Sequence, residues 1–150
     1  MRIVHNSENC IGCKACQQAC QDYHNLPARV RFMEITETET MIDGQVAVTY
    51  HMSVCRQCRH AACLSECMEG AISKNEQGVA VIDEALCIGC GRCMEACPEY
   101  AIRLKKTSRG RKAIKCAVCI NYIKKGEAEG AARRPICAEA CPLDCISVGA

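Results

Sequence analysis

The sequence predicts an α+β fold in which short helices alternate with β-hairpins. Two observations lead to this prediction. Seventeen of the 150 residues are cysteine, and sixteen of them form four groups along the chain. Several segments between the groups alternate apolar and polar residues, which is the period of a half-buried strand. The chain length suits one domain or two very small ones.

The four cysteine groups share a short spacing between their members. The first group follows the pattern C-x2-C-x2-C-x3-C, and the third repeats it and is followed by Pro98. The second has one x4 gap, whereas the fourth has one long gap and is followed by Pro142. In chain order the groups are Cys10, Cys13, Cys16, Cys20; Cys55, Cys58, Cys63, Cys67; Cys87, Cys90, Cys93, Cys97; and Cys116, Cys119, Cys137, Cys141, with Cys145 left over.

Each group is expected to run from a ligand loop through a short helix into a short strand, because "CMEGAI" (67–72) parallels "CPEYAI" (97–102). Residues 71–83 predict a β-hairpin. An inserted β-hairpin is predicted around 29–52, where two alternating segments flank the turn signal Asp43-Gly44. We expect "KKTSRGRK" (105–112) to be a basic linker and "KKGEAEGAARR" (124–134) to be a polar loop.

The cysteines are better explained as metal ligands than as disulfides. The N-terminal segment has no secretory signal pattern, and no run approaches 18 apolar residues, so we expect a cytoplasmic protein without a membrane span. Disulfides are disfavoured in that compartment. An odd number of cysteines also fits full pairing poorly. Neighbours three residues apart converge on one point and do not link distant segments.

The spacing favours iron–sulfur clusters over zinc. A cubane cluster needs four thiolates, and the loop C-x2-C-x2-C supplies three of them. In two-cluster bacterial ferredoxins, with the run C-x2-C-x2-C-x3-C-P, the last cysteine ligates the other cluster. Residues 87–98 match that run, proline included. Zinc sites favour two C-x2-C pairs, so the middle thiol of three would be redundant, although the second group alone is compatible with zinc.

The order and gaps of the four groups resemble a known family, the four-cluster ferredoxin-like electron-transfer subunits of multisubunit oxidoreductases. "KCAVC" (115–119) and "RRPICAEACP" (133–142) are similar to that family's last group. The resemblance spans residues 10–142. One departure is Met68, which follows Cys67 where the family usually has proline; Cys67 is retained as a ligand.

The resemblance implies that the first group pairs with the fourth and the second with the third. It therefore implies two nested modules of the two-cluster bacterial ferredoxin type, an outer one of residues 1–52 plus 105–150 and a central one of residues 53–104. The implied ligands are Cys10, Cys13, Cys16, Cys141 for cluster 1; Cys20, Cys116, Cys119, Cys137 for cluster 2; Cys55, Cys58, Cys63, Cys97 for cluster 3; and Cys67, Cys87, Cys90, Cys93 for cluster 4.

The family's function implies a non-catalytic subunit of a hetero-oligomer. Through four [4Fe-4S] clusters it would relay single electrons between a catalytic oxidoreductase subunit and a second redox partner. A molybdenum or tungsten enzyme is favoured as that partner, and carbon monoxide dehydrogenase, hydrogenase and formate dehydrogenase remain open. Two alternatives are a free polyferredoxin and a structural or regulatory metal module. Export with a partner that carries the signal is a further alternative to the cytoplasm.

Other residues add no second chemistry. No catalytic residue is expected, because cysteines fill all sixteen ligand positions and the four histidines form no metal pattern. The formal net charge of +2 falls to about −6 once sixteen thiolates hold four oxidised cores, so nucleic-acid binding is not expected. Cys145 is an alternative to Cys141 as a ligand, and the proline after Cys141 favours Cys141.

Overall fold

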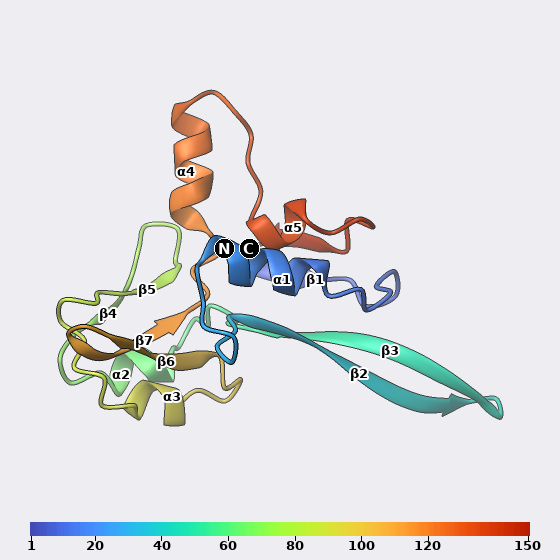
Figure 1. Cartoon of the computed structure of the whole chain (residues 1–150), viewed down its shortest axis with the longest axis horizontal. Coiled ribbons are helices and arrows are strands. Elements are labelled where there is room, and N and C mark those ends of the chain that lie inside the picture. The colour runs from blue at the N-terminus through green and yellow to red at the C-terminus, as the bar shows by residue number, and fades with distance from the viewer.

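A computed structural model describes residues 1–150 and contains five helices and eight strands (Figure 1). The predicted α+β class is confirmed. The strands form four separate antiparallel pairs, and no larger sheet is present. In chain order the elements are β1 (Arg2–His5), α1 (Ala15–Tyr23), β2 (Met33–Ile42), β3 (Gln45–Val54), α2 (Ala62–Ser65), β4 (Ile72–Lys74), β5 (Ala80–Ile82), α3 (Arg92–Glu95), β6 (Ile102–Thr107), β7 (Gly110–Lys115), α4 (Ile120–Ala128), α5 (Ile136–Glu139) and β8 (Ile146–Gly149).

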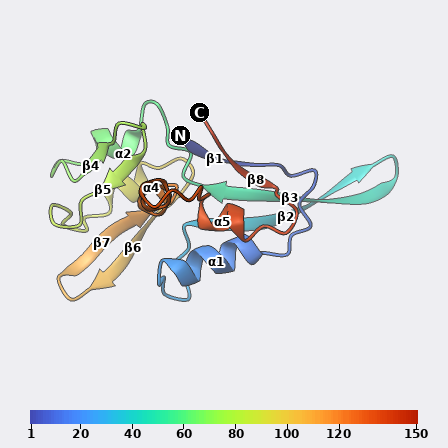
Figure 2. The same ribbon diagram turned by 90° about the horizontal axis from the view of Figure 1, so that it is seen from above.

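The two ends of the chain pair with each other. Strand β1 runs antiparallel to β8, with Arg2 opposite Gly149 and His5 opposite Ile146. Figures 1 and 2 accordingly show the N- and C-termini side by side. The hairpins β4–β5 and β6–β7 lie with α2 and α3 in a separate part of the molecule.

The apolar core is small and is split between these two parts. The larger cluster of buried residues combines Ile3, Met33, Ile35 and Ile146 with four cysteines. The smaller one combines Ile72 and other residues of the hairpins with two cysteines. Only 29 of the 150 residues are buried, and cysteines are prominent among them. Small chains with so little core need an additional stabilising element, usually disulfides or metal.

Strands β2 and β3 form a long arm that projects from the body (Figures 1 and 2). Asp43 and Gly44 connect them with φ angles of 50° and 76°, the left-handed pair that a two-residue hairpin turn of type I′ needs. Met33, Ile35 and Val54 are buried at the base of the arm, whereas most of the remainder is exposed. The predicted inserted hairpin is confirmed, with paired strands that begin at Met33.

The expectation of a basic linker over residues 105–112 is wrong. These residues form most of the β6–β7 hairpin, in which Lys105 lies opposite Lys112. Ile102 and Ala113 of the same two strands are buried. The many lysines and arginines therefore make the alternation of these strands hard to recognise in the sequence, although the apolar residues Ile102 and Ala113 pack inward. The hairpin runs across the boundary between residues 104 and 105.

The expectation of a polar loop over residues 124–134 is wrong for its first part, because α4 continues to Ala128. Lys125 and Glu129 form an ion pair across one helical turn, at 3.8 Å. The presence of glycine at position 126 within this helix is explained by packing, since an added Cβ would collide with the carbonyl oxygen of Ala131 on the returning loop. The helix thus ends where the chain folds back on itself.

Candidate metal centres

The first cysteine group wraps a cavity beside the base of the arm. Cys10, Cys13 and Cys16 line this cavity together with Cys141, which comes from the end of α5. Gly12 allows the loop its tight course, because its φ is +68° and the Tyr50 ring occupies the space where a Cβ would lie. The loop therefore brings three thiols to one side of the cavity, and a distant segment supplies the fourth.

A second cavity is surrounded by Cys67, Cys87, Cys90 and Cys93. Gly89 has a φ of +71°, and the missing Cβ leaves room for the carbonyl oxygen of Arg111 on β7. The third cysteine group is thereby held close under the β6–β7 hairpin.

The third cavity is lined by Cys55, Cys58, Cys63 and Cys97. Helix α2 carries Cys63, and Cys67 follows two residues after the helix ends. Helix α3 carries Cys93, and Cys97 likewise follows that helix. Each of these short helices therefore sends one thiol to each of two neighbouring cavities.

The remaining set of predicted ligands is buried where α1 meets α5. Cys20, Cys116 and Cys137 are buried and Cys119 is half-buried. Burial raises the pKa of Cys20 far above its usual range, and repulsion from thiolates at Cys116, Cys137 and Cys119 raises it further. These four thiols thus lie within electrostatic reach of one another.

Thiol pKa values report how crowded the sulfur atoms are. Burial raises the pKa of Cys93 to about 11 and that of Cys137 to about 12, and repulsion from neighbouring cysteine thiolates adds to both. Burial raises the pKa of Cys16 to about 11, and the thiolates of Cys141, Cys13 and Cys10 add to the rise. Such thiols are neutral at pH 7, so a bound cation must drive their deprotonation.

The arrangement of the thiols does not fit a single metal ion. No group of three or more His, Cys, Asp or Glu side chains in the structure is arranged to hold one ion. A zinc ion would need its sulfur ligands about 2.3 Å away on all sides. Four thiols around one cavity fit a larger inorganic core such as a cubane, which needs four thiolates.

One backbone N–H group donates to a cysteine sulfur in each of the four sets. The pairs of donor and sulfur are Cys145 N to Cys141 Sγ at 3.2 Å, Val118 N to Cys116 Sγ at 3.4 Å, Ala101 N to Cys97 Sγ at 3.4 Å, and Ala113 N to Cys87 Sγ at 3.3 Å. Such hydrogen bonds orient metal ligands and tune the metal that they hold.

Three side chains near the sulfur atoms were not singled out by the sequence analysis. Lys115 Nζ lies 3.6 Å from Cys55 Sγ, and Gln57 donates to the carbonyl oxygen of Cys116 at 2.9 Å. His24 Nε2 lies 3.6 Å from Cys119 Sγ. In the sequence Lys115 directly precedes Cys116 and Gln57 directly precedes Cys58, but adjacency says nothing about the reach of Lys115 to Cys55 or of Gln57 to Cys116.

Cys145 is buried next to the first cavity. Its backbone N–H donates to the sulfur of Cys141, whereas its own sulfur lies 3.7 Å from the carbonyl oxygen of Leu143. Its backbone therefore supports Cys141 whichever of the two thiols binds metal.

Comparison with known proteins identifies the family. The profile of the 4Fe-4S dicluster domain matches residues 46–150, and the profile of a 4Fe-4S binding domain matches residues 1–22. The chain belongs to the 4Fe-4S dicluster family. The prediction that the cysteines hold 4Fe-4S clusters is thereby confirmed.

Three relatives show which proteins this family member is similar to. It is 36% identical to the B subunit of anaerobic dimethyl sulfoxide reductase of Escherichia coli, over 96% of this chain and 70% of the relative. It is 30% identical to the B subunit of polysulfide reductase of Wolinella succinogenes, over 98% and 74%. It is 31% identical to the thiosulfate reductase electron transfer subunit of Salmonella typhi, over 98% and 74%. The prediction of a non-catalytic iron–sulfur electron-transfer subunit is confirmed.

None of the helices combines the length and the apolar character that crossing a membrane requires.

Proposed function

We propose that this chain relays single electrons through four [4Fe-4S] clusters between the catalytic subunit of a molybdenum or tungsten oxidoreductase and a second redox partner. The relatives support this proposal, because their names are those of sulfur-compound reductase subunits. The single observation that carries it is the gathering of sixteen cysteines into four sets of four. Each set is drawn from more than one cysteine group.

The proposed ligands are those implied by the spacing and the family. Three of the sets line one cavity each. In the remaining set, charges at Cys116, Cys137 and Cys119 raise the pKa of Cys20, which indicates that these four residues lie close together. They are Cys10, Cys13, Cys16, Cys141 for cluster 1; Cys20, Cys116, Cys119, Cys137 for cluster 2; Cys55, Cys58, Cys63, Cys97 for cluster 3; and Cys67, Cys87, Cys90, Cys93 for cluster 4.

Two nested modules follow from this assignment. The outer module, residues 1–52 plus 105–150, holds clusters 1 and 2, and the pairing of β1 with β8 supports its closure from both chain ends. The central module, residues 53–104, holds clusters 3 and 4 through the thiols exchanged by α2 and α3. The β6–β7 hairpin connects the modules, because β6 follows Cys97 and β7 leads into Cys116.

The proposed order of the four clusters along the electron-transfer chain, called the wire below, follows from the helices that the clusters share and from the exposure of their ligands. Clusters 1 and 2 share α1, which carries Cys16 and Cys20, and clusters 3 and 4 share α2 and α3. Gln57, in the loop of cluster 3, contacts the backbone of Cys116 at cluster 2. Cys13 and Cys90 are the exposed cysteines, so clusters 1 and 4 are the proposed ends of the wire.

The protein's own contribution is to hold, insulate and bias the clusters. A bound [4Fe-4S] cluster supplies a site that exchanges one electron, at a potential that burial and hydrogen bonds to sulfur adjust. The N–H groups of Cys145, Val118, Ala101 and Ala113 each donate to a ligand sulfur. These four donors stabilise the more negative, reduced state.

Iron analysis combined with paired serine variants tests the assignment. We expect about sixteen irons per chain after anaerobic reconstitution, as four [4Fe-4S] clusters require. Cys141→Ser should disturb the electron paramagnetic resonance (EPR) signal of one cluster, whereas Cys145→Ser should retain all four. Loss of a cluster in Cys145→Ser but not in Cys141→Ser would exchange the two roles. Fewer than about fourteen irons in the unaltered protein would refute the four-cluster count.

A free polyferredoxin is the alternative within the same chemistry. Native anaerobic purification separates the two, because a subunit leaves the column with its catalytic partner and a shuttle leaves alone. We place the complex in the cytoplasm in this proposal, and fractionation would detect export with a partner that carries a signal.

A further inference from the structure

Lys115 is the one charged residue among the buried residues of the protein. Only 6% of its surface is exposed, at the end of β7 directly before Cys116. An ammonium removed from water is costly unless hydrogen bonds and an opposite charge compensate it. The surroundings of Lys115 therefore indicate what the charge is for.

The hydrogen bonds of Lys115 are satisfied by neutral groups. Its Nζ donates to the carbonyl oxygens of Ala80 and Cys116, the latter at 3.0 Å, and lies 3.5 Å from Oε1 of Gln57. No carboxylate forms an ion pair with it, since the five ion pairs of the protein all involve other residues. The compensating negative charge must come from another source.

A proposed ligand sulfur lies beside Lys115 and would carry negative charge as a cluster-bound thiolate. Nζ lies 3.6 Å from Cys55 Sγ, a proposed ligand of cluster 3, and Cys116 is a proposed ligand of cluster 2. The ammonium also opposes the rise in the pKa of Cys63 and Cys116 that burial causes. Its field thus reaches thiols of both sets, at the junction of the two modules.

We propose that Lys115 is a fixed internal cation that raises the reduction potential of the cluster bound at Cys55, Cys58, Cys63 and Cys97, and so sets the energy level at the junction of the wire. A positive charge stabilises the reduced, more negative form of a neighbouring cluster, and low exposure leaves that attraction poorly screened. The proposal rests on the ligand sets proposed above.

The test uses variants that separate charge from packing. Lys115→Met removes the charge and keeps an unbranched apolar stem, whereas Lys115→Arg keeps the charge. Gln57→Leu removes polar contacts of the same network without changing charge. Lys106→Met is the matched surface control, because Lys106 is an exposed cation of the same hairpin. Iron content and far-ultraviolet circular dichroism of each variant report whether the protein has assembled.

The expected result is a shift of one potential in an intact protein. In redox titrations followed by EPR, Lys115→Met should lower the midpoint reduction potential of one cluster. This shift should be much larger than any shift in the midpoint potential of the most distant cluster. That shift should persist at high salt. Lys115→Arg, Gln57→Leu and Lys106→Met should stay near the unaltered protein. Four intact signals with unmoved midpoints in Lys115→Met would overturn the role of Lys115 alone, whereas missing cluster signals in the unaltered protein would overturn the ligand sets.

A measurement without substitution covers the case in which the Lys115 variants fail to assemble. The protein is labelled with ¹⁵N-lysine, and pulsed EPR of its reduced clusters is recorded. A coupled lysine nitrogen is expected, because Nζ of Lys115 lies 3.6 Å from Cys55 Sγ, whereas Nζ of Lys74 and Lys112 donates to the carbonyl oxygens of Cys58 and Cys87 and not to a sulfur atom. Absence of that coupling would contradict the position of the charge at the cluster.

Discussion

At the scale of single residues, two glycines separate backbone strain from close packing: Gly89 lies in a ligand loop, and Gly78 lies in the turn between β4 and β5. Gly89 has a φ of +71°, which L side chains rarely adopt, and its missing Cβ is replaced by the carbonyl oxygen of Arg111. Gly78 has a φ of +73°, but nothing lies within 4 Å of the position that its Cβ would take. The two positions share a backbone conformation and differ in packing, so together they form a matched pair.

We therefore predict a graded effect for these two substitutions. Gly78→Ala should lower the stability of the protein by about 1 kcal/mol through backbone strain alone. Gly89→Ala should cost more, because the β6–β7 hairpin must also move away from the loop that holds Cys87 and Cys90. Anaerobic thermal unfolding and the iron content of the two variants measure this. Equal effects would show that the close approach of Arg111 is unimportant.

At the scale of elements, short-range patterns were predictable from the sequence and side-chain reach was not. The cysteine spacing shows which thiols lie together in one loop and which thiol follows after it, so the ligand loops could be predicted. Asp43-Gly44 predicts a tight turn, so the arm could be predicted as well. The β6–β7 hairpin was missed because Lys105, Lys112 and their neighbours hide its alternation. The last part of α4 was missed because glycine usually disfavours the interior of a helix. Here Gly126 lies inside the helix because the returning loop packs against it and leaves no room for a Cβ. The contact of Lys115 with Cys55 joins residues 60 apart in sequence, a separation at which no local pattern predicts contacts.

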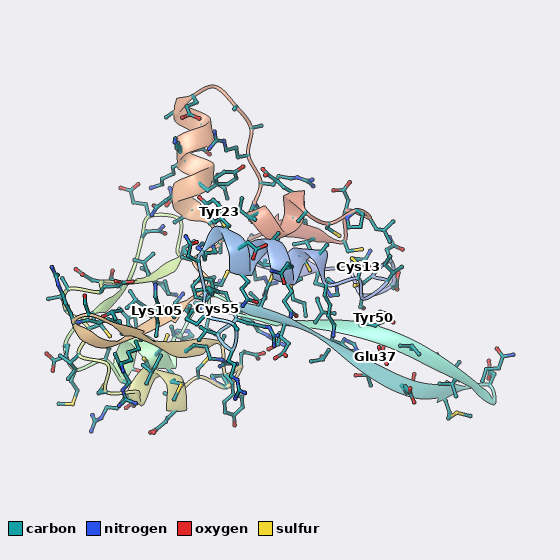
Figure 3. All side chains as sticks on the ribbon, viewed as in Figure 1. Cys13, Tyr23, Glu37, Tyr50, Cys55 and Lys105 are labelled. Atoms are coloured by element: carbon teal, nitrogen blue, oxygen red, sulfur yellow. The ribbon has the colours of Figure 1, made fainter.

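The arm provides a prediction at the same scale. Its outer part makes no contribution to the buried core, since residues 38–49 are exposed or half-exposed. Replacement of Glu39–Val48 by Asn-Gly should join Thr38 to Thr49 with a favoured two-residue turn, because this pair has the same hydrogen-bonding phase in the ladder as Ile42 and Gln45 at the natural turn. The shortened protein should bind as much iron as the full chain and unfold at a similar temperature. A loss of iron would mean that the outer arm supports the cluster loops. Figure 3 shows that Glu37 and Tyr50 lie on the arm side, near Cys13 and away from Lys105.

At the scale of the whole molecule, metal and folding are expected to be one process. The apolar core is small and contains many of the thiols themselves. The binding energy of the clusters therefore becomes folding energy. Without iron the thiols have nothing to bind in common, and the small apolar core alone is not expected to hold the surrounding loops in place.

This coupling predicts a pH dependence for the iron-free chain. Burial raises the pKa of Cys116 and Cys137 to about 12 in the folded state, whereas an unfolded thiol has a pKa of about 8.5. Because the folded pKa is raised, the thiols favour folding fully below pH about 8.5 and progressively less as the pH rises towards 12. The iron-free chain should be largely unfolded at pH 7 and should lose its residual structure by pH 10. The iron-loaded protein should retain its fold, because its thiolates are already ionised on iron.

Circular dichroism of both forms under anaerobic conditions checks this prediction. A native-like spectrum of the iron-free chain at pH 7 would contradict the coupling, and a gain of structure at pH 10 would contradict its sign.

The pairing of β1 with β8 has a consequence for biosynthesis. Among the strands and helices described here β1 is synthesised first, and it has no partner until β8 has been made, since Arg2 pairs with Gly149. The ligand loop that follows β1 therefore stays without its fourth proposed ligand, Cys141, while the middle of the chain is synthesised and folds. Iron insertion should therefore begin in the interior of the chain and finish beside the β1–β8 pair. Translation that stops before β8 would leave a half-loaded product with reactive thiols.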